Sequence, residues 1–259
     1  NTTQQDENIM NTTFQRIWKD NYRIHSYEAD MSGRATVPAL LQFMQESAWN
    51  HAEHLELGYS HLIKKNLAWV MARLSLHIQQ LPIWGDDIYL ETWPSERDKL
   101  FAYRDFRLTT DTDEVLALGT TTWLVIDIQS RRPQRTESYF HIPDWEFHRA
   151  LPGFAPKVPA PQHIDTTTER RVFFSHLDVN GHVNNVKYLE YFMDSFPTEF
   201  LQQHQLVQAD LNFIAEALVL NEVLVQTQQL ENSTFVQRLI RKQGAQELCR
   251  AKTMWQPLP

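Results

Sequence analysis

The chain contains two diverged copies of one segment, and this repeat limits the possible folds more than any other feature of the sequence. Residues 22–47 (YRIHSYEADMSGRATVPALLQFMQES) align without a gap with residues 170–195 (RRVFFSHLDVNGHVNNVKYLEYFMDS), at an offset of 148. Each copy has a short apolar segment, a turn at a glycine, and then an apolar pattern with the helical period. Thr36 and Asn184 are equivalent in the alignment, and both residue types are good helix N-caps. The repeat therefore predicts one strand–turn–helix unit twice.

The segments that follow each copy also match. Strands are predicted near residues 69–80, 87–93, 101–110 and 115–128 in the first half, and near 207–217, 222–229, 233–241 and 246–255 in the second. Hairpin turns are expected at Asp111–Asp113 and at Gln243–Gly244. One long helix followed by several antiparallel strands is an α+β pattern. We expect a tandem double hot-dog, in which each sheet wraps its own helix and the two sheets join side by side, hiding an edge.

Prolines separate the two halves. They stand at positions 143, 152, 156, 159 and 161, and the polar run Asp165–Glu169 follows them. We therefore predict an N-terminal hot-dog over residues 12–142, a proline-rich linker over 143–169, and a C-terminal hot-dog over 170–259.

Composition excludes several classes of protein. Of 259 residues, 42% are hydrophobic and 22% are charged, which is typical of a folded domain with one large core or two ordinary ones. The net charge of −8 argues against general nucleic-acid binding. No apolar run approaches the roughly 18 residues of a transmembrane helix, so membrane insertion is not expected. The single cysteine, Cys249, forms no disulfide framework and is expected to be a small core residue.

The two copies differ at positions suited to chemistry. The second has Asn180-Gly-His182 where the first has Ser32-Gly-Arg34. Both lie on a turn that leads into a helix N-terminus, where free backbone N–H groups stabilise an oxyanion. An imidazole there can transfer protons near neutral pH. Glu216, expected in the middle or at the end of an apolar strand, corresponds to Gln79 in the first half.

Each of these residues alone has an ordinary structural explanation, because turn histidines and edge-strand glutamates are common. The set is harder to explain in that way, and the candidate catalytic residues are Asp178, Asn180, His182 and Glu216. The G-x-S-x-G, G-x-G-x-x-G and P-loop motifs are all missing. His51, His54 and His61 match no common zinc spacing, so neither a metal nor a cofactor is expected.

Residues 178–188, DVNGHVNNVKY, resemble the D-x-N-x-H-x-N-N-x-K-Y signature of the acyl-acyl carrier protein thioesterases, the plant FatA/FatB type and its bacterial relatives. The resemblance extends from Tyr22 to Trp255, with support from Trp69–Arg73 and Ser130–Pro133. It implies the double hot-dog fold and hydrolysis of acyl carrier protein thioesters to free fatty acids. It also implies catalytic roles for Asp178, Asn180, His182 and Glu216.

Plant members commonly have a cysteine after that glutamate, but this chain has Ala217. A covalent thiol mechanism at this position is therefore excluded, and we expect water to attack the thioester directly. The resemblance places the acyl chain in the first half, along residues 36–55 and 69–78. A plastid transit peptide is not seen, so a bacterial cytoplasmic enzyme is expected.

Arg131, Arg132 and Arg135 form a basic run in an acidic protein, and they are candidates for binding the acidic carrier protein. A solvated loop is the structural alternative. Three other functions stay open: an acyl-CoA thioesterase, a non-catalytic acyl-thioester sensor, and a hot-dog dehydratase, against which the Asn180–His182 turn argues. The covalent tandem already pairs two hot-dogs, so a monomer suffices and a homodimer is compatible.

Overall fold

The computed structural model describes residues 15–136, 148–231 and 233–258. The first half contains strands β1 (Trp18–Arg23), β2 (Leu67–Ile78), β3 (Asp87–Arg97), β4 (Phe101–Thr109), β5 (Val115–Asp127) and β6 (Pro133–Gln134), with helices α1 (Val37–His54) and α2 (Tyr59–Leu62). The second half contains strands β7 (Thr166–Arg171), β8 (His204–Phe213), β9 (Glu222–Gln229), β10 (Thr234–Arg241) and β11 (Glu247–Pro257), with helices α3 (Asn185–Met193) and α4 (Thr198–Gln203).

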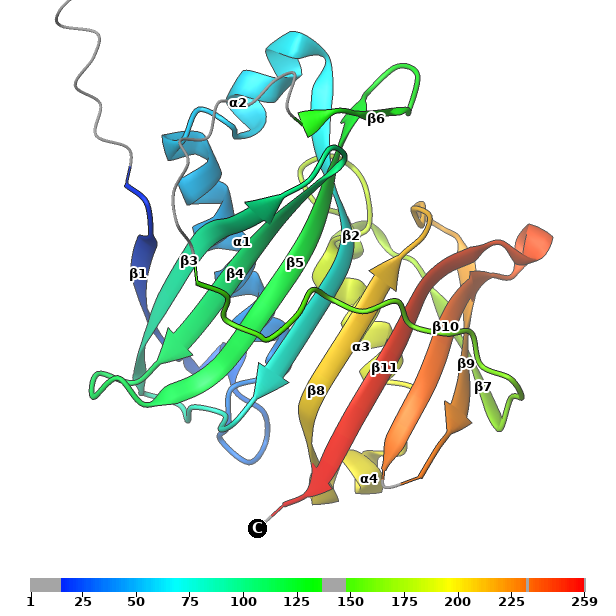
Figure 1. Ribbon diagram of the computed structural model, residues 1–259. Helices are drawn as coiled ribbons and strands as arrows, with labels where there is room; N and C mark the ends of the chain where they lie inside the picture. The colour runs from blue at the N-terminus through cyan, green and yellow to red at the C-terminus, as the bar shows by residue number, and fades with distance from the viewer. Residues whose placement is uncertain (1–14, 137–147, 232, 259) are drawn as a thin grey trace, which may run out of the picture.

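All these strands belong to one antiparallel sheet, in the order β1-β3-β4-β5-β2-β8-β11-β10-β9-β7, and β6 pairs with β5. The halves meet in the middle of this sheet, where Arg73–His77 of β2 pairs with Gln208–Asn212 of β8. Figure 1 shows α1 and α3 on the same face of the sheet, each behind the strands of its own half. The two helices contact each other, so the core is continuous across the junction.

Both central helices begin as the sequence predicts. The hydroxyl of Thr36 accepts a hydrogen bond from Ala39 N at the start of α1, and the side chain of Asn184 accepts one from Val186 N at the start of α3. These caps satisfy backbone donors that lack a partner within the helix. The face of α1 that packs on the sheet is apolar at Leu40 and Met44, whereas its last turn buries His51.

The segment after Arg149 crosses the outer face of the sheet, in front of the strands in Figure 1. Its Leu151, Ala155 and Val158 side chains are buried. Val158 N donates a hydrogen bond of 2.7 Å to the side chain of Asn212 in β8. The described part of the proline-rich segment is therefore packed against the sheet, and its last residues, from Thr166, form β7 and pair with β9.

The predicted strands lie close to the observed ones, and the turns at Asp111–Asp113 and Gln243–Gly244 are confirmed. Cys249 is buried in β11, as expected of a small core residue. One prediction is wrong: β8 ends at Phe213, so Glu216 lies in the following loop and not in a strand. The ladder stops there because Ile214 N and Ala215 N both donate to the same carbonyl, Leu248 O.

Candidate active site

The turn before α3 is organised by one carboxylate. Oδ1 of Asp178 accepts hydrogen bonds from Asn180 N at 2.8 Å and from His182 N at 3.3 Å. Asp178 N donates to His182 O at 2.8 Å, which closes the turn. Gly181 has a φ of 76°, in the left-handed region that favours glycine. The backbone of this turn thus fixes where the His182 side chain begins.

The first copy builds the same turn with the same bonds. Oδ1 of Asp30 accepts from Ser32 N at 2.7 Å and from Arg34 N at 3.3 Å, and Gly33 has a φ of 80°. The aspartate and the glycine therefore serve the fold in both copies. What distinguishes the second copy is the pair of side chains that this turn presents, an amide and an imidazole.

The loop after β8 holds Glu216 through its backbone. Arg241 Nη2 donates to the carbonyl of Glu216 at 3.0 Å. The hydroxyl of Tyr188 accepts a 3.0 Å hydrogen bond from Ala217 N. Burial raises the pKa of Tyr188 to about 12, so this phenol stays protonated at neutral pH. Helix α3 and strand β10 thus both fix the loop that carries the carboxylate.

The structure brings two of the four candidate residues into contact. His182 Nε2 lies 3.5 Å from Glu216 Oε2, and the side chains are 40% and 35% exposed. This separation is long for a hydrogen bond, but it suits an ion pair or two groups that share a water. Asp178 reaches His182 through the backbone of the turn. Asn180 is exposed on that turn, and its amide makes no hydrogen bond to another described residue.

The first hot-dog also contributes to this site. Arg131 Nη2 lies 2.6 Å from Glu216 Oε1, an ion pair between a loop of the first half and a loop of the second. Arg132 and Arg135, the other members of the basic run, are exposed and form no ion pair with any residue that the structure describes. The three arginines therefore differ in their surroundings, although they are close in sequence.

Apolar side chains are exposed in the same loops as the candidate residues. They are Phe173, Phe174, Val179, Leu218, Val219 and Leu220. Solvent-facing apolar groups gathered near a polar site are typical of a surface that binds another molecule.

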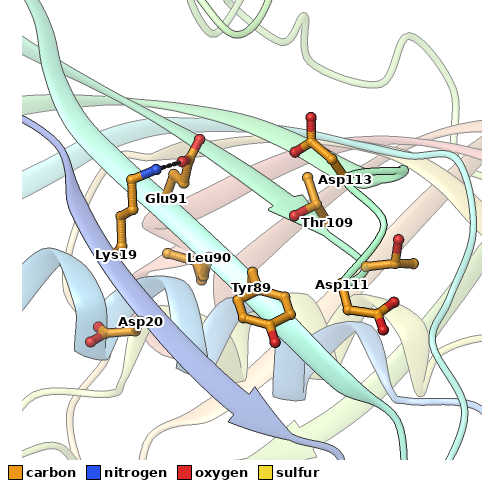
Figure 2. Close-up of a pocket in the computed structure, with 9 residues that line it drawn as sticks. Lys19, Asp20, Tyr89, Leu90, Glu91, Thr109, Asp111 and Asp113 are labelled. Atoms are coloured by element: carbon orange, nitrogen blue, oxygen red, sulfur yellow. Dashed lines mark hydrogen bonds and ion pairs between the residues drawn. The ribbon is translucent and has the colours of Figure 1, made fainter.

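A surface hollow on the first half is separate from the candidate catalytic residues. It lies at the β1, β3 and β4 edge of the sheet, and Figure 2 shows Asp20, Glu91, Asp111 and Asp113 around it, with Lys19 paired to Glu91. None of the candidate catalytic residues lines it. In the described part of the chain, no three metal-ligating side chains converge, and no helix is long and apolar enough to cross a membrane.

Sequence comparison identifies the family. Residues 15–141 match the acyl-ACP thioesterase N-terminal domain, and residues 160–257 match the acyl-ACP thioesterase C-terminal domain, where ACP is acyl carrier protein. The chain belongs to the acyl-ACP thioesterase family.

Curated relatives include a chloroplastic palmitoyl-acyl carrier protein thioesterase of Gossypium hirsutum, which is 29% identical over 93% of this chain and 64% of its own length. The chloroplastic oleoyl-acyl carrier protein thioesterase 1 of Arabidopsis thaliana is 28% identical over 93% of this chain and 76% of its own length. The chain thus spans less than two thirds of the first of these relatives.

Solved structures of similar shape include an acyl-ACP thioesterase from Bacteroides thetaiotaomicron, with a TM-score of 0.84, 22% identity and coverage of 93% of this chain and 98% of that one. The 12:0-ACP thioesterase from Umbellularia californica has a TM-score of 0.83, 23% identity and coverage of 94% and 98%. At these identities the likeness concerns the fold, and it confirms the predicted double hot-dog.

Three contacts of the site were not predicted from the sequence. Tyr188 is the last residue of the 178–188 signature, so its type was visible, but its bond to Ala217 N was not. Arg241 lies in an ordinary strand pattern, so nothing in the sequence marked it as a residue of the site. Arg131 was assigned to carrier binding, and its contact with Glu216 appears only once the halves are joined.

Proposed function

We propose that this family member hydrolyses fatty acyl-ACP thioesters to free fatty acid and carrier protein by direct attack of water. The observation that carries the proposal is the His182–Glu216 pair, 3.5 Å apart on two loops of the second hot-dog. Family membership and the names of the plant relatives support the substrate class.

The proposed reaction needs a base, an oxyanion site and a leaving group. Glu216 and His182 hold a water and take its proton, and the water oxygen bonds to the thioester carbonyl carbon. The resulting oxyanion is stabilised by donors at this turn, among them the amide of Asn180. The intermediate collapses with cleavage of the carbon–sulfur bond, and the phosphopantetheine thiolate leaves and is protonated. Asp178 positions the turn.

We further propose that the two halves have different roles. The N-terminal hot-dog, residues 12–142, binds the acyl chain along α1 and β2, and the C-terminal hot-dog, residues 170–259, carries the catalytic set, with residues 143–169 as linker. Arg132 and Arg135 are exposed cations in a protein of net charge −8, which supports a role in binding an acidic carrier. The monomeric or dimeric state and the bacterial cytoplasmic location stay predictions.

The first experiment measures free fatty acid release from purified long-chain and medium-chain acyl-ACP. We expect His182→Ala and Glu216→Gln each to lower kcat by at least about 100-fold, the range for loss of a general base. The matched control is His163→Ala, because His163 forms an exposed pair with Asp165 at 3.3 Å outside the site. It is expected to keep full turnover.

Substrate comparison separates the alternatives. If Arg132→Glu with Arg135→Glu raises KM for acyl-ACP but not for a small acyl thioester, the carrier-binding role is supported; equal effects on both would refute it. Equal or better turnover of acyl-CoA by the native protein would favour an acyl-CoA thioesterase. Tight binding of acyl thioesters without any release would favour a sensor.

A further inference from the structure

The carboxylate of Glu216 is held from two sides by residues of different halves. Its Oε1 faces Arg131 Nη2 at 2.6 Å, and its Oε2 faces His182 Nε2 at 3.5 Å. The two oxygens therefore have separate partners. With Oε1 engaged by the guanidinium, the carboxylate is turned so that Oε2 is the oxygen available to the imidazole and to a water between them.

The turn that carries Arg131 is itself firmly built. Asp127 Oδ1 accepts from Ser130 N at 2.7 Å and from Ser130 Oγ at 2.8 Å, and Asn66 Nδ2 donates to Asp127 Oδ2 at 2.8 Å. The bonds from Ser130 hold the pKa of Asp127 below its usual range, so this anchor stays ionised. Arg131 N donates to Asp127 O at 2.9 Å, which fixes the base of the arginine side chain.

Arg131 occupies a backbone position that glycine or asparagine would adopt more easily. Its φ is 58°, and an ordinary L-residue in the left-handed region is disfavoured by about 1–2 kcal/mol. A side chain kept at such a position is consistent with a function for its end group. Here the end group is the guanidinium that contacts Glu216.

We propose that Arg131 is a positioning residue for Glu216, supplied to the catalytic half by the other hot-dog. The inference rests on the proposed thioester hydrolysis, and it separates Arg131 from Arg132 and Arg135, which do not reach the carboxylate. The ion pair is partly exposed, with side-chain exposures of 51% and 35%, so it contributes little to stability. Its effect is geometric, and small misplacements of a reacting group lower rates by up to about 100-fold.

The test compares Arg131→Gln and Arg131→Lys on two substrates, an acyl-ACP and an acyl-N-acetylcysteamine that lacks the carrier. Arg131→Gln is expected to lower kcat by about 10- to 100-fold on both, with KM nearly unchanged on the small substrate. Arg131→Lys should recover part of the loss, because it keeps a cation but not the planar fork. The control is Arg23→Gln, which breaks an exposed Arg23–Asp87 pair of 3.8 Å at the far edge of the sheet.

A double variant distinguishes positioning from a separate effect. Added to Glu216→Gln, the Arg131→Gln change should lower kcat no further, because the group it positions is no longer a carboxylate. The thermal midpoint of each variant verifies that it is folded.

Three outcomes overturn the inference while leaving thioester hydrolysis intact. The first is a change confined to KM for the carrier substrate, which would make Arg131 a docking residue. The second is a double variant in which the two substitutions lower kcat multiplicatively. The third is faster turnover in Arg131→Gln, which would make the ion pair inhibitory. A native protein that hydrolyses neither substrate refutes the proposed function itself, and the inference fails with it.

Discussion

At the scale of single residues, His51 is a buried imidazole that the folded protein keeps neutral. Its Nδ1 faces Arg104 Nη1 at 3.0 Å, and its Nε2 lies 2.8 Å from Gln15 O. The arginine can only donate, so Nδ1 accepts and Nε2–H donates to the carbonyl. Burial first, and then the charge of Arg104, lower the pKa of His51 to about 3.

This histidine predicts a loss of stability in acid. The imidazole of His51 takes up a proton near pH 6.5 in the unfolded chain but only near pH 3 in the folded protein. Its contribution to the free energy of unfolding is therefore complete above pH 6.5 and is lost as the pH falls from 6.5 towards 3. The slope from this one group is at most about 1.4 kcal/mol per pH unit. Urea unfolding at pH 7, 6 and 5 should show a shallower slope for His51→Gln than for the native protein. An unchanged slope in His51→Gln would contradict the assignment.

Substitution of the two equivalent aspartates, Asp30 and Asp178, distinguishes a structural role from a catalytic one. Each accepts the same two backbone N–H groups of its turn. We expect Asp30→Ala and Asp178→Ala to destabilise the protein similarly, by about 0.5–1.5 kcal/mol, because each removes equivalent hydrogen bonds of a solvent-exposed turn. Only Asp178→Ala should lower kcat strongly, since only its turn carries His182. Unfolding free energies and acyl-ACP turnover test both parts, and strong loss of turnover in Asp30→Ala would refute the distinction.

At the scale of elements, α3 holds the loop of Glu216 through one phenol. Ala217 is fully buried, so its N–H has Tyr188 as its partner in place of water. Tyr188→Phe leaves this donor unsatisfied and should destabilise the protein by about 1–3 kcal/mol. A looser loop should also lower kcat by about tenfold. Tyr191→Phe is the control, because its hydroxyl contacts His176 at 2.6 Å and not this loop. Equal kcat in the two variants would contradict the coupling.

The elements themselves were largely predictable. Helical periodicity and the caps at Thr36 and Asn184 gave α1 and α3, and alternating apolar residues gave the strands. The end of β8 was not predictable, because the loop after it is as apolar as a strand: Ile214 and Leu218–Leu220 are exposed there. Composition alone does not distinguish a buried strand from an apolar loop at a site, and Glu216 was misplaced for that reason.

At the scale of the whole molecule, the repeat predicted two joined sheets but not which strands would join. β2 and β8 have similar patterns to the other strands, and only three-dimensional packing selects them. Three of the four candidate residues, Asn180, His182 and Glu216, could be found by comparing the two copies, whereas Asp178 is shared with the first copy as Asp30. The ion pair of Arg131 with Glu216 could not, because it depends on the junction between halves that each fold around their own helix.

The linker is held on the outer face of this sheet by an ion pair between the partly exposed Arg149 and a buried aspartate. Asp105 is fully buried, and its Oδ2 accepts from Arg149 Nε at 2.9 Å and from Ala150 N at 2.7 Å. Its Oδ1 accepts from Thr120 Oγ1 at 2.7 Å within the sheet, so Oδ2 is the oxygen whose partners come from the docked linker. Arg149→Leu removes the cation from a buried anion, and such changes destabilise proteins by about 3–5 kcal/mol.

We therefore expect Arg149→Leu to lower the unfolding free energy of the entire chain in one step. Since one continuous sheet and core join the halves, urea unfolding should shift to a lower midpoint without splitting into two transitions. Adding Asp105→Asn should recover part of the loss, because it removes the unpaired charge. If Arg149→Leu instead produced two separate transitions, the linker would be holding together halves that unfold independently, and the cooperative unit would be the single hot-dog.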